Sequence, residues 1–197
     1  MMSYFDDTLN VLRDALMSVS SEELAKLVDD CVKTLKTGHK IICSGLGKNV
    51  PVCDKFVGTM NSLGLNASFM NTNSAVHGDI GMVQDQDLVI ILTKSGETAE
   101  SIYLNRLLNQ RTCIQWLLTF EEESTLTHTI NKKIVMQLKH EGDMWDIVPN
   151  NSTTLNMIVL QTVAMQVAQK MQISLEQFKR NHPGGHIGDI LRDEKDY

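Results

Sequence analysis

DLVIILTKSGET, at residues 87–98, is the most informative stretch of this chain. Its first half is a continuous apolar run, which predicts a strand over 87–93 that is buried on both faces. Its second half gathers hydroxyl side chains around Gly96, and a helical pattern over 98–109 follows at once. A buried strand, a tight polar loop and a helix together make one unit of an alternating α/β fold.

The same alternation continues on both sides of this stretch. Apolar runs predict four further strands, at 40–44, 67–70, 113–119 and 133–138. Helical periodicity predicts two helices within 5–36 with a serine cap at Ser20 or Ser21, then helices over 51–63 and 152–171. We therefore expect an α/β fold, a three-layer α-β-α sandwich around a five-stranded parallel sheet, doubly wound and flavodoxin-like.

Composition and charge narrow the class of protein. The 197 residues include 42% hydrophobic and 21% charged residues, with a formal net charge of −6. This charge argues against a nucleic acid or a membrane surface as the partner, because both attract clustered lysine and arginine. The first ten residues carry Asp6 and Asp7 and no basic start, and the four cysteines show no paired spacing. We therefore expect a cytoplasmic protein without a signal peptide or membrane span.

The predicted organisation is a single domain over residues 1–197. It comprises N-terminal helices (1–37), an α/β core (38–191) and a polar tail (192–197). The long helix at 152–171 carries apolar residues on more than one face, which indicates burial on more than one side. In a domain of this size, that pattern predicts a homo-oligomer, a dimer or a tetramer.

Ligands of a doubly wound sheet bind beyond the carboxyl ends of its strands, where two loops qualify. The first, residues 44–49, is glycine-rich and carries Lys48, which can reach a phosphate or a sugar oxygen; a solvated lysine is the alternative. The second, residues 93–100, precedes a helix whose unpaired N–H groups favour an anion. Its hydroxyls belong to Thr93, Ser95 and Thr98, which can also serve simply as helix caps.

Further polar candidates lie in four other segments. His77 and Asp79 follow the second predicted strand, Glu141 follows the fifth, residues 150–154 open the long helix, and His182 precedes Pro183 and two glycines. No set of His, Cys or Asp shows a metal-binding spacing, and no nucleophile elbow is present. We therefore expect neither a metal nor a cofactor.

These segments together resemble a known family. The chain is similar to sugar isomerase (SIS) domain proteins of the KpsF/GutQ type, which include bacterial arabinose-5-phosphate isomerases. The resemblance covers roughly residues 30–191 and rests on SGLGK (44–48), AVHGDIGMV (75–83), TKSGET (93–98), STT (152–154) and HPGGHIG (182–188). Family members often carry paired CBS modules after this region, so we expect a version with the SIS domain alone.

The resemblance implies an aldose–ketose isomerase that acts on a phosphorylated sugar through an enediol. It implies catalytic roles for Lys48, Glu100, Glu141, His182 and His77. It implies substrate and phosphate contacts at Ser44, Gly45, Thr93, Ser95, Gly96, Thr98, Ser152 and Thr153.

The chemistry of such an isomerase assigns the expected roles. A base must move a proton between adjacent carbons, and Glu141 is the first choice. His182 suits ring opening or proton shuttling, and Lys48 suits charge on the enediolate. Asp143, Trp145 and Asp146 depart from the family, which leaves the substrate open: the pair arabinose 5-phosphate and ribulose 5-phosphate, or another sugar phosphate such as a hexulose 6-phosphate. The alternative is a sugar-phosphate-binding regulator without catalysis.

Overall fold

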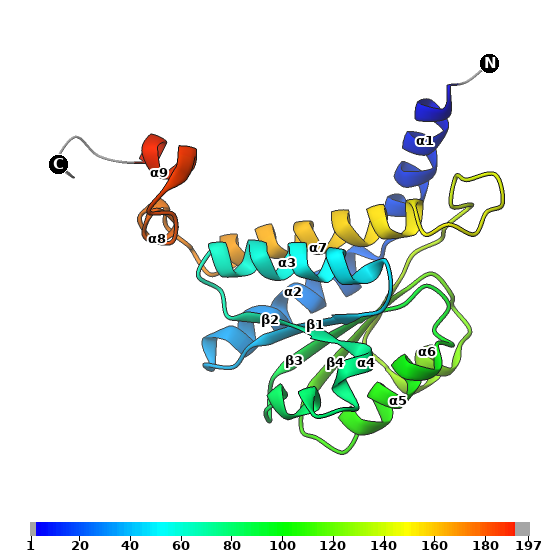
Figure 1. Cartoon of the computed structure of the whole chain (residues 1–197), viewed down its shortest axis with the longest axis horizontal. Coiled ribbons are helices and arrows are strands. Elements are labelled where there is room, and N and C mark those ends of the chain that lie inside the picture. The colour runs from blue at the N-terminus through cyan, green and yellow to red at the C-terminus, as the bar shows by residue number, and fades with distance from the viewer. Residues whose placement is uncertain (1–2, 192–197) are drawn as a thin grey trace.

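The computed structural model describes residues 3–191, so the predicted tail at 192–197 lies outside them. Five strands form one sheet (Figure 1): β1 (Ile41–Gly45), β2 (Ala67–Asn71), β3 (Leu88–Leu92), β4 (Ile114–Thr119) and β5 (Lys133–Val135). Their order across the sheet is β2-β1-β3-β4-β5, and every neighbouring pair runs parallel. The predicted five-stranded, doubly wound parallel sheet is therefore confirmed, although the fifth strand is shorter than expected.

Long and short helices connect the strands. The long ones, all predicted, are α1 (Tyr4–Met17), α2 (Ser21–Lys36), α3 (Asn49–Ser62), α5 (Ala99–Leu108) and α7 (Asn151–Lys170). The short ones were not predicted: α4 (Thr72–Ala75), the 3₁₀ helix η1 (Asp79–Met82), α6 (Thr125–Thr129), α8 (Leu175–Arg180) and α9 (Gly185–Leu191). Ser20 caps α2 as expected, since its hydroxyl accepts a hydrogen bond from the backbone N–H of Glu23 at 3.2 Å.

Two apolar cores lie on opposite faces of the sheet, because successive strand residues point to opposite sides. Ile41 and Cys43 of β1 join the core under α2, α3 and α7, whereas Ile42 joins the core over α4, α5 and α6. Figure 1 shows these two groups of helices on either side of the sheet. The predicted three-layer sandwich is therefore confirmed.

The long helix α7 is covered mainly by its own chain. It packs against α1, α2 and α3, which accounts for its buried residues on several faces. Ile158 and Met165 remain exposed on it. The wide apolar pattern is therefore weaker support for an oligomer than we expected, and the oligomer stays a prediction. Between residues 3 and 191, no helix combines the length and the apolar character needed to span a bilayer.

Candidate active site

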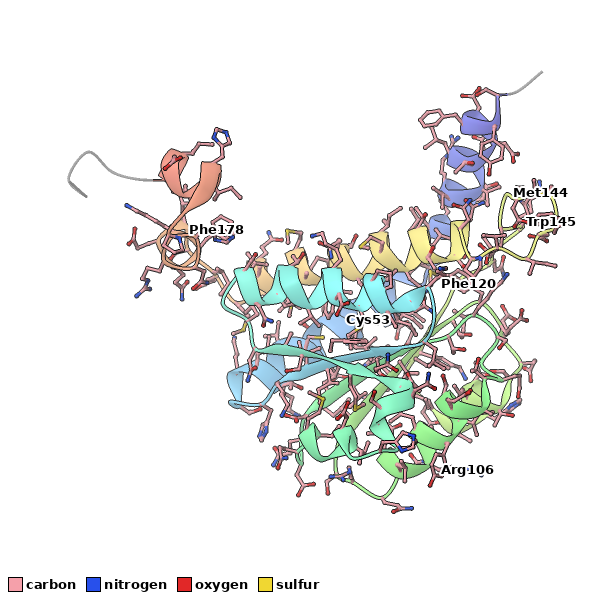
Figure 2. All side chains as sticks on the ribbon, in the orientation of Figure 1. Cys53, Arg106, Phe120, Met144, Trp145 and Phe178 are labelled. Carbon is pink, nitrogen blue, oxygen red and sulfur yellow. The ribbon has the colours of Figure 1, made fainter. Side chains whose placement is uncertain are left out.

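A cavity of about 240 Å³ lies at the carboxyl ends of β1 and β3. The chain leaves the sheet in opposite directions after these two strands, and this is where doubly wound sheets bind ligands. Four segments line the cavity: Leu46, Gly47, Lys48 and Asn49 after β1; Leu92, Thr93, Lys94, Thr98 and Ser101 around the start of α5; Phe120 after β4; and Pro149, Ser152, Thr153 and Asn156 around the start of α7. Figure 2 labels Phe120 at this end of the molecule.

The loop between β3 and α5 forms one wall of the cavity. The Thr93 hydroxyl accepts a hydrogen bond from the backbone N–H of Gly96 at 3.2 Å, which fixes the turn. Thr98 immediately precedes α5 and lines the cavity, and its hydroxyl makes no capping hydrogen bond to the helix. The first N–H groups of α5 therefore have no partner from this cap residue, and an anion in the cavity can accept from them.

Gly96 is required by the geometry of this loop. Its φ of +67° lies in the left-handed region, and an added Cβ would lie 2.1 Å from Ser124 Oγ. Ser95, in contrast, is exposed, and its hydroxyl accepts a hydrogen bond from the backbone N–H of Glu97 at 3.2 Å. Of the four predicted ligand contacts in this loop, Thr93 and Thr98 line the cavity, whereas Ser95 and Gly96 do not.

We expect Gly96→Ala to lower the free energy of unfolding by about 1–3 kcal/mol, because the methyl group needs both a strained φ and space that Ser124 occupies. The displaced loop should also weaken phosphate binding. Thermal unfolding and calorimetry measure the two effects. Gly58→Ala is the matched control, because a Cβ at Gly58 meets nothing within 4 Å. Equal stability of both variants would contradict this account of the loop.

Lys94 and Glu141 form an ion pair behind the cavity wall. Lys94 Nζ lies 2.8 Å from Glu141 Oε1, and the Lys94 side chain is 43% exposed whereas that of Glu141 is 0% exposed. The Glu141 carboxylate also accepts from the Ser152 hydroxyl at 2.6 Å and from the backbone N–H groups of Ser152 and Asn150 at 2.9 and 3.0 Å. Burial raises the pKa of Glu141, but these four donors outweigh it and hold the pKa below its ordinary value.

This environment suits Glu141 to a positioning role. A base needs an accessible lone pair and a pKa near the working pH, whereas Glu141 is buried, fully hydrogen-bonded and a weak base. Its geometry instead positions Lys94 and the first turn of α7 at the cavity. The role of Glu141 as the base stays a prediction.

The glycine loop after β1 contributes Lys48 to the cavity. Lys48 directly precedes α3, is exposed, and lines the cavity. Ser44 and Gly45 lie deeper and do not line it. The buried Ser44 hydroxyl is hydrogen-bonded to Thr72 at 3.0 Å, and a Cβ on Gly45 would lie 2.9 Å from Asn49 Cβ. Ser44 therefore ties the end of β1 to α4, and Gly45 lets the chain pass close to α3; substrate contacts at these two positions stay a prediction.

The first turn of α7 contributes two of the expected substrate contacts, Ser152 and Thr153, which both line the cavity. The Ser152 hydroxyl is already used, because it donates to Glu141. The Thr153 hydroxyl donates to the carbonyl of Asn150 at 3.0 Å. Each hydroxyl oxygen therefore retains lone pairs, but its proton is engaged within the chain.

Three predicted catalytic residues, Glu100, His77 and His182, do not line the cavity of this chain. Glu100 is exposed in the first turn of α5 and does not line it. His77 follows α4, beyond the edge strand β2, and does not line it either.

His182 lies at the far end of the molecule. The neighbouring Asn181 donates a hydrogen bond to the carbonyl of Ser62, the last residue of α3, whereas the cavity meets the first residue, Asn49. The 14 residues of α3 span about 20 Å at the usual helical rise. The His182 ring packs on Phe178 with centroids 4.0 Å apart, and Figure 2 shows Phe178 at the opposite end from Phe120.

The sequence did not predict four polar residues that line the cavity: Asn49, Lys94, Ser101 and Asn156. Lys94 lies inside the loop that was singled out, so its position was a usable signal. Asn156 follows Ser152 by four residues, which places both on one face of α7. No comparable signal marks Ser101, because it is a small polar residue within a helix.

The arrangement can bind an anion and an adjoining polar group. Two lysines, Lys48 and Lys94, and the start of α5 supply positive charge and donors, while Thr93, Thr98 and Thr153 supply hydroxyl oxygens. Among residues 3–191, no group of three or more His, Cys, Asp and Glu side chains is placed to hold a metal ion.

Comparisons with known proteins identify relatives. The SIS domain family model matches residues 34–165. The chain is 29% identical over 188 residues to an arabinose 5-phosphate isomerase, KdsD, of Pseudomonas aeruginosa, covering 93% of this chain and 56% of that protein. It is 33% identical over 153 residues to an uncharacterized protein of Chlamydia pneumoniae, covering 77% of this chain and 46% of that protein.

A solved structure is also similar to this chain. A protein of Escherichia coli CFT073, in complex with arabinose 5-phosphate, superimposes with a TM-score of 0.83 and 26% identity, over 91% of this chain and 94% of that chain. The chain spans about half the length of the curated relatives it matches.

Proposed function

Since the SIS family model covers well over half of it, the chain belongs to the SIS domain family, and we propose that it is a sugar-phosphate isomerase. The observation that carries the proposal is the cavity itself, where an uncapped helix start and Lys48 meet beside a polar wall. The relatives support an aldose–ketose reaction on arabinose 5-phosphate or a related sugar phosphate.

In the proposed reaction, the phosphate binds at Thr93, Thr98 and the first N–H groups of α5. With its phosphate bound there, the sugar has its carbons beside Lys48. The Lys48 ammonium group then stabilises the negative charge of the enediolate. Lys94 also lines the cavity, where the Glu141 carboxylate holds its ammonium group in place. The reaction moves a proton between adjacent carbons of one molecule, so its electrons balance without a redox cofactor.

A homo-oligomer supplies the remaining group. His182 lies too far from the cavity of its own chain, so we propose that His182 of a second copy transfers or shuttles the proton. Exposed apolar side chains gather at both ends of the molecule and would cover one another in such an assembly: Tyr4, Phe5 and Leu9 on α1, Met144, Trp145, Ile147 and Val148 in the loop before α7, and Leu175, Ile187 and Ile190 on α8 and α9. Figure 2 shows Met144 and Trp145 at the outer end of their loop.

The proposal also places the protein in the cytoplasm. All four cysteines, Cys31, Cys43, Cys53 and Cys113, are free thiols, and burial raises the pKa of Cys31, Cys43 and Cys113. Buried thiols of this kind suit a reducing compartment.

Isotope exchange tests the function directly. The protein is incubated in deuterated water with pentose and hexose phosphates, and deuterium at the carbon next to the carbonyl is measured. We expect exchange with at least one sugar phosphate. Absence of exchange with all of them, together with tight binding of one, would favour the non-catalytic regulator.

Thr98→Val is expected to weaken binding of inorganic phosphate about 10- to 100-fold, the worth of one hydrogen bond to a charged group. The variant keeps the shape of the side chain and removes its hydroxyl from the cavity. Calorimetry measures the affinity. Thr162→Val is the control, because the Thr162 hydroxyl bonds to the carbonyl of Ile158 on α7, away from the cavity. Unchanged affinity in Thr98→Val would exclude this wall from the phosphate site.

A further inference from the structure

An asparagine pair joins two helices at one wall of the cavity. Asn49 begins α3, and Asn156 lies in the second turn of α7. The Asn156 side-chain N–H donates to Asn49 Oδ1 at 3.0 Å, and both residues line the cavity. Neither residue was among the predicted site residues, and neither has a place in the reaction as described above.

The other half of the Asn156 amide has no partner. Asn156 is 1% exposed, and within residues 3–191 no group donates a hydrogen bond to its Oδ1. A buried amide oxygen without a donor is destabilising, so such oxygens in native proteins face a ligand or an ordered water. Here the oxygen belongs to a residue that borders the cavity, which makes a bound molecule the natural donor.

The position of the pair indicates which part of a ligand it meets. The phosphate wall is built by the loop before α5, whereas the asparagine pair belongs to the wall built by α3 and α7. A ligand anchored by its phosphate therefore presents a different part of its chain to Asn156. A carboxamide is neutral and suits a hydroxyl group rather than a second anion.

We propose that Asn156, held in place by Asn49, is a specificity-determining residue that accepts a hydrogen bond from one hydroxyl of the bound sugar. This inference rests on the proposed function, because it names a contact within the same cavity. It gives a physical basis for choosing among sugars that share a phosphate: a sugar that presents this hydroxyl satisfies the buried oxygen, and one that lacks it leaves the oxygen unpaired.

The test compares sugars and variants together. The sugar phosphate that turns over fastest and its single-deoxy analogues are assayed with the parent protein and with Asn156→Ala. We expect Asn156→Ala to lower kcat/KM for the full sugar about 10- to 100-fold and to leave inorganic phosphate affinity unchanged. For one deoxy analogue, parent and variant should differ by less than about 3-fold, because the contact is already absent. An equal loss with every analogue would overturn the proposal, since a merely structural role acts on all of them alike.

Gln161→Ala is the matched control. Gln161 also joins α7 to α3, through Thr59 at 2.9 Å, and its side-chain nitrogen is also buried without a partner. It does not line the cavity, so we expect it to leave sugar selectivity unchanged. Asn49→Ala is the second variant, for use if Asn156→Ala does not fold. It removes the hydrogen bond that holds the Asn156 side chain and keeps Asn156 itself. Like Asn156→Ala, it should lower kcat/KM for the full sugar but not for the deoxy analogue that lacks the same hydroxyl. Retention of the parent selectivity would count against the proposal.

Binding experiments separate this inference from the isomerase. If the parent protein exchanges no deuterium with any sugar phosphate, the proposed function fails. Calorimetry then tests the subsite alone: the parent must bind one sugar phosphate more tightly than inorganic phosphate, and Asn156→Ala must lose that difference. A parent that binds both ligands equally would overturn the subsite, whatever the fate of the isomerase.

Discussion

Mixing Lys48→Ala protein with His182→Ala protein is expected to restore about one quarter of the parent activity, because two copies share each site in the proposed assembly. Alone, Lys48→Ala should lose about 10²- to 10³-fold in kcat through lost charge stabilisation. His182→Ala should lose about 10²- to 10⁴-fold through lost proton transfer.

The quarter follows from counting sites. If equal amounts of the two variants form pairs at random, half of the pairs contain one chain of each variant. In such a pair, one site combines an intact Lys48 with an intact His182, and the other site lacks both. The measurement is the initial rate of isomerisation after the two proteins are unfolded together and refolded.

The control mixes two variants from the same cavity, Lys48→Ala and Lys94→Ala. Both residues line the cavity of one chain, so no pairing rebuilds an intact site. This mixture should stay as inactive as its parts. No recovery in the first mixture, with both proteins folded and oligomeric, would show that His182 does not complete the site of a neighbour.

Glu141→Gln is expected to lower the free energy of unfolding by about 1–3 kcal/mol near neutral pH, since it removes a charge to which four groups donate. The amide of glutamine also places an N–H₂ group toward Lys94 or Ser152, both of which are donors to Glu141. Chemical unfolding of parent and variant measures the difference. Glu22→Gln is the control, because the Lys26–Glu22 pair has the same 2.8 Å separation but is exposed to solvent. We expect no measurable change there.

The pH dependence of this difference has a defined sign. The folded-state pKa of Glu141 lies below its ordinary value of 4.5. The stabilisation is therefore fully present above the unfolded-state pKa and is lost as the pH falls through the folded-state pKa. The two unfolding curves should differ by a constant amount near neutral pH and converge as the pH falls below about 4.5.

The activity of Glu141→Gln separates positioning from catalysis. A positioning role predicts a loss of about 10- to 100-fold in kcat/KM with the shape of the parent pH–rate profile retained. Complete loss of deuterium exchange in a folded variant that still binds phosphate would instead make Glu141 the base.

The sheet was predictable because its strands are buried on both faces. Val89, Ile90 and Ile91 are each 0% exposed, so their run of apolar residues had a single physical cause. The phosphate loop followed from the same strand, since the chain must turn at Thr93 and begin a helix after Thr98. The short helices α4, α6 and α8 carried no such signal, because four to six residues contain too little periodicity to detect.

The site was harder to predict because it depends on distances between segments. The sequence marks His182 as a notable histidine, but only the structure shows that α3 separates it from the cavity. The sequence likewise marks Glu141, but its burial beneath Lys94 depends on where α7 begins. Asn156 is one of several polar residues in α7, and its place in the cavity wall follows from the packing of α3 on α7.

The hydrogen bond between Asn181 and Ser62 fixes His182 at one end of α3 while the cavity occupies the other. A rigid helix therefore keeps the two halves of the proposed site apart within every chain. The consequence is one of mass action: a solitary chain can hold its ligand but has no partner to complete the chemistry. Catalytic output would then scale with the fraction of chains that are assembled, so that the cellular concentration of the protein itself governs how fast each copy works.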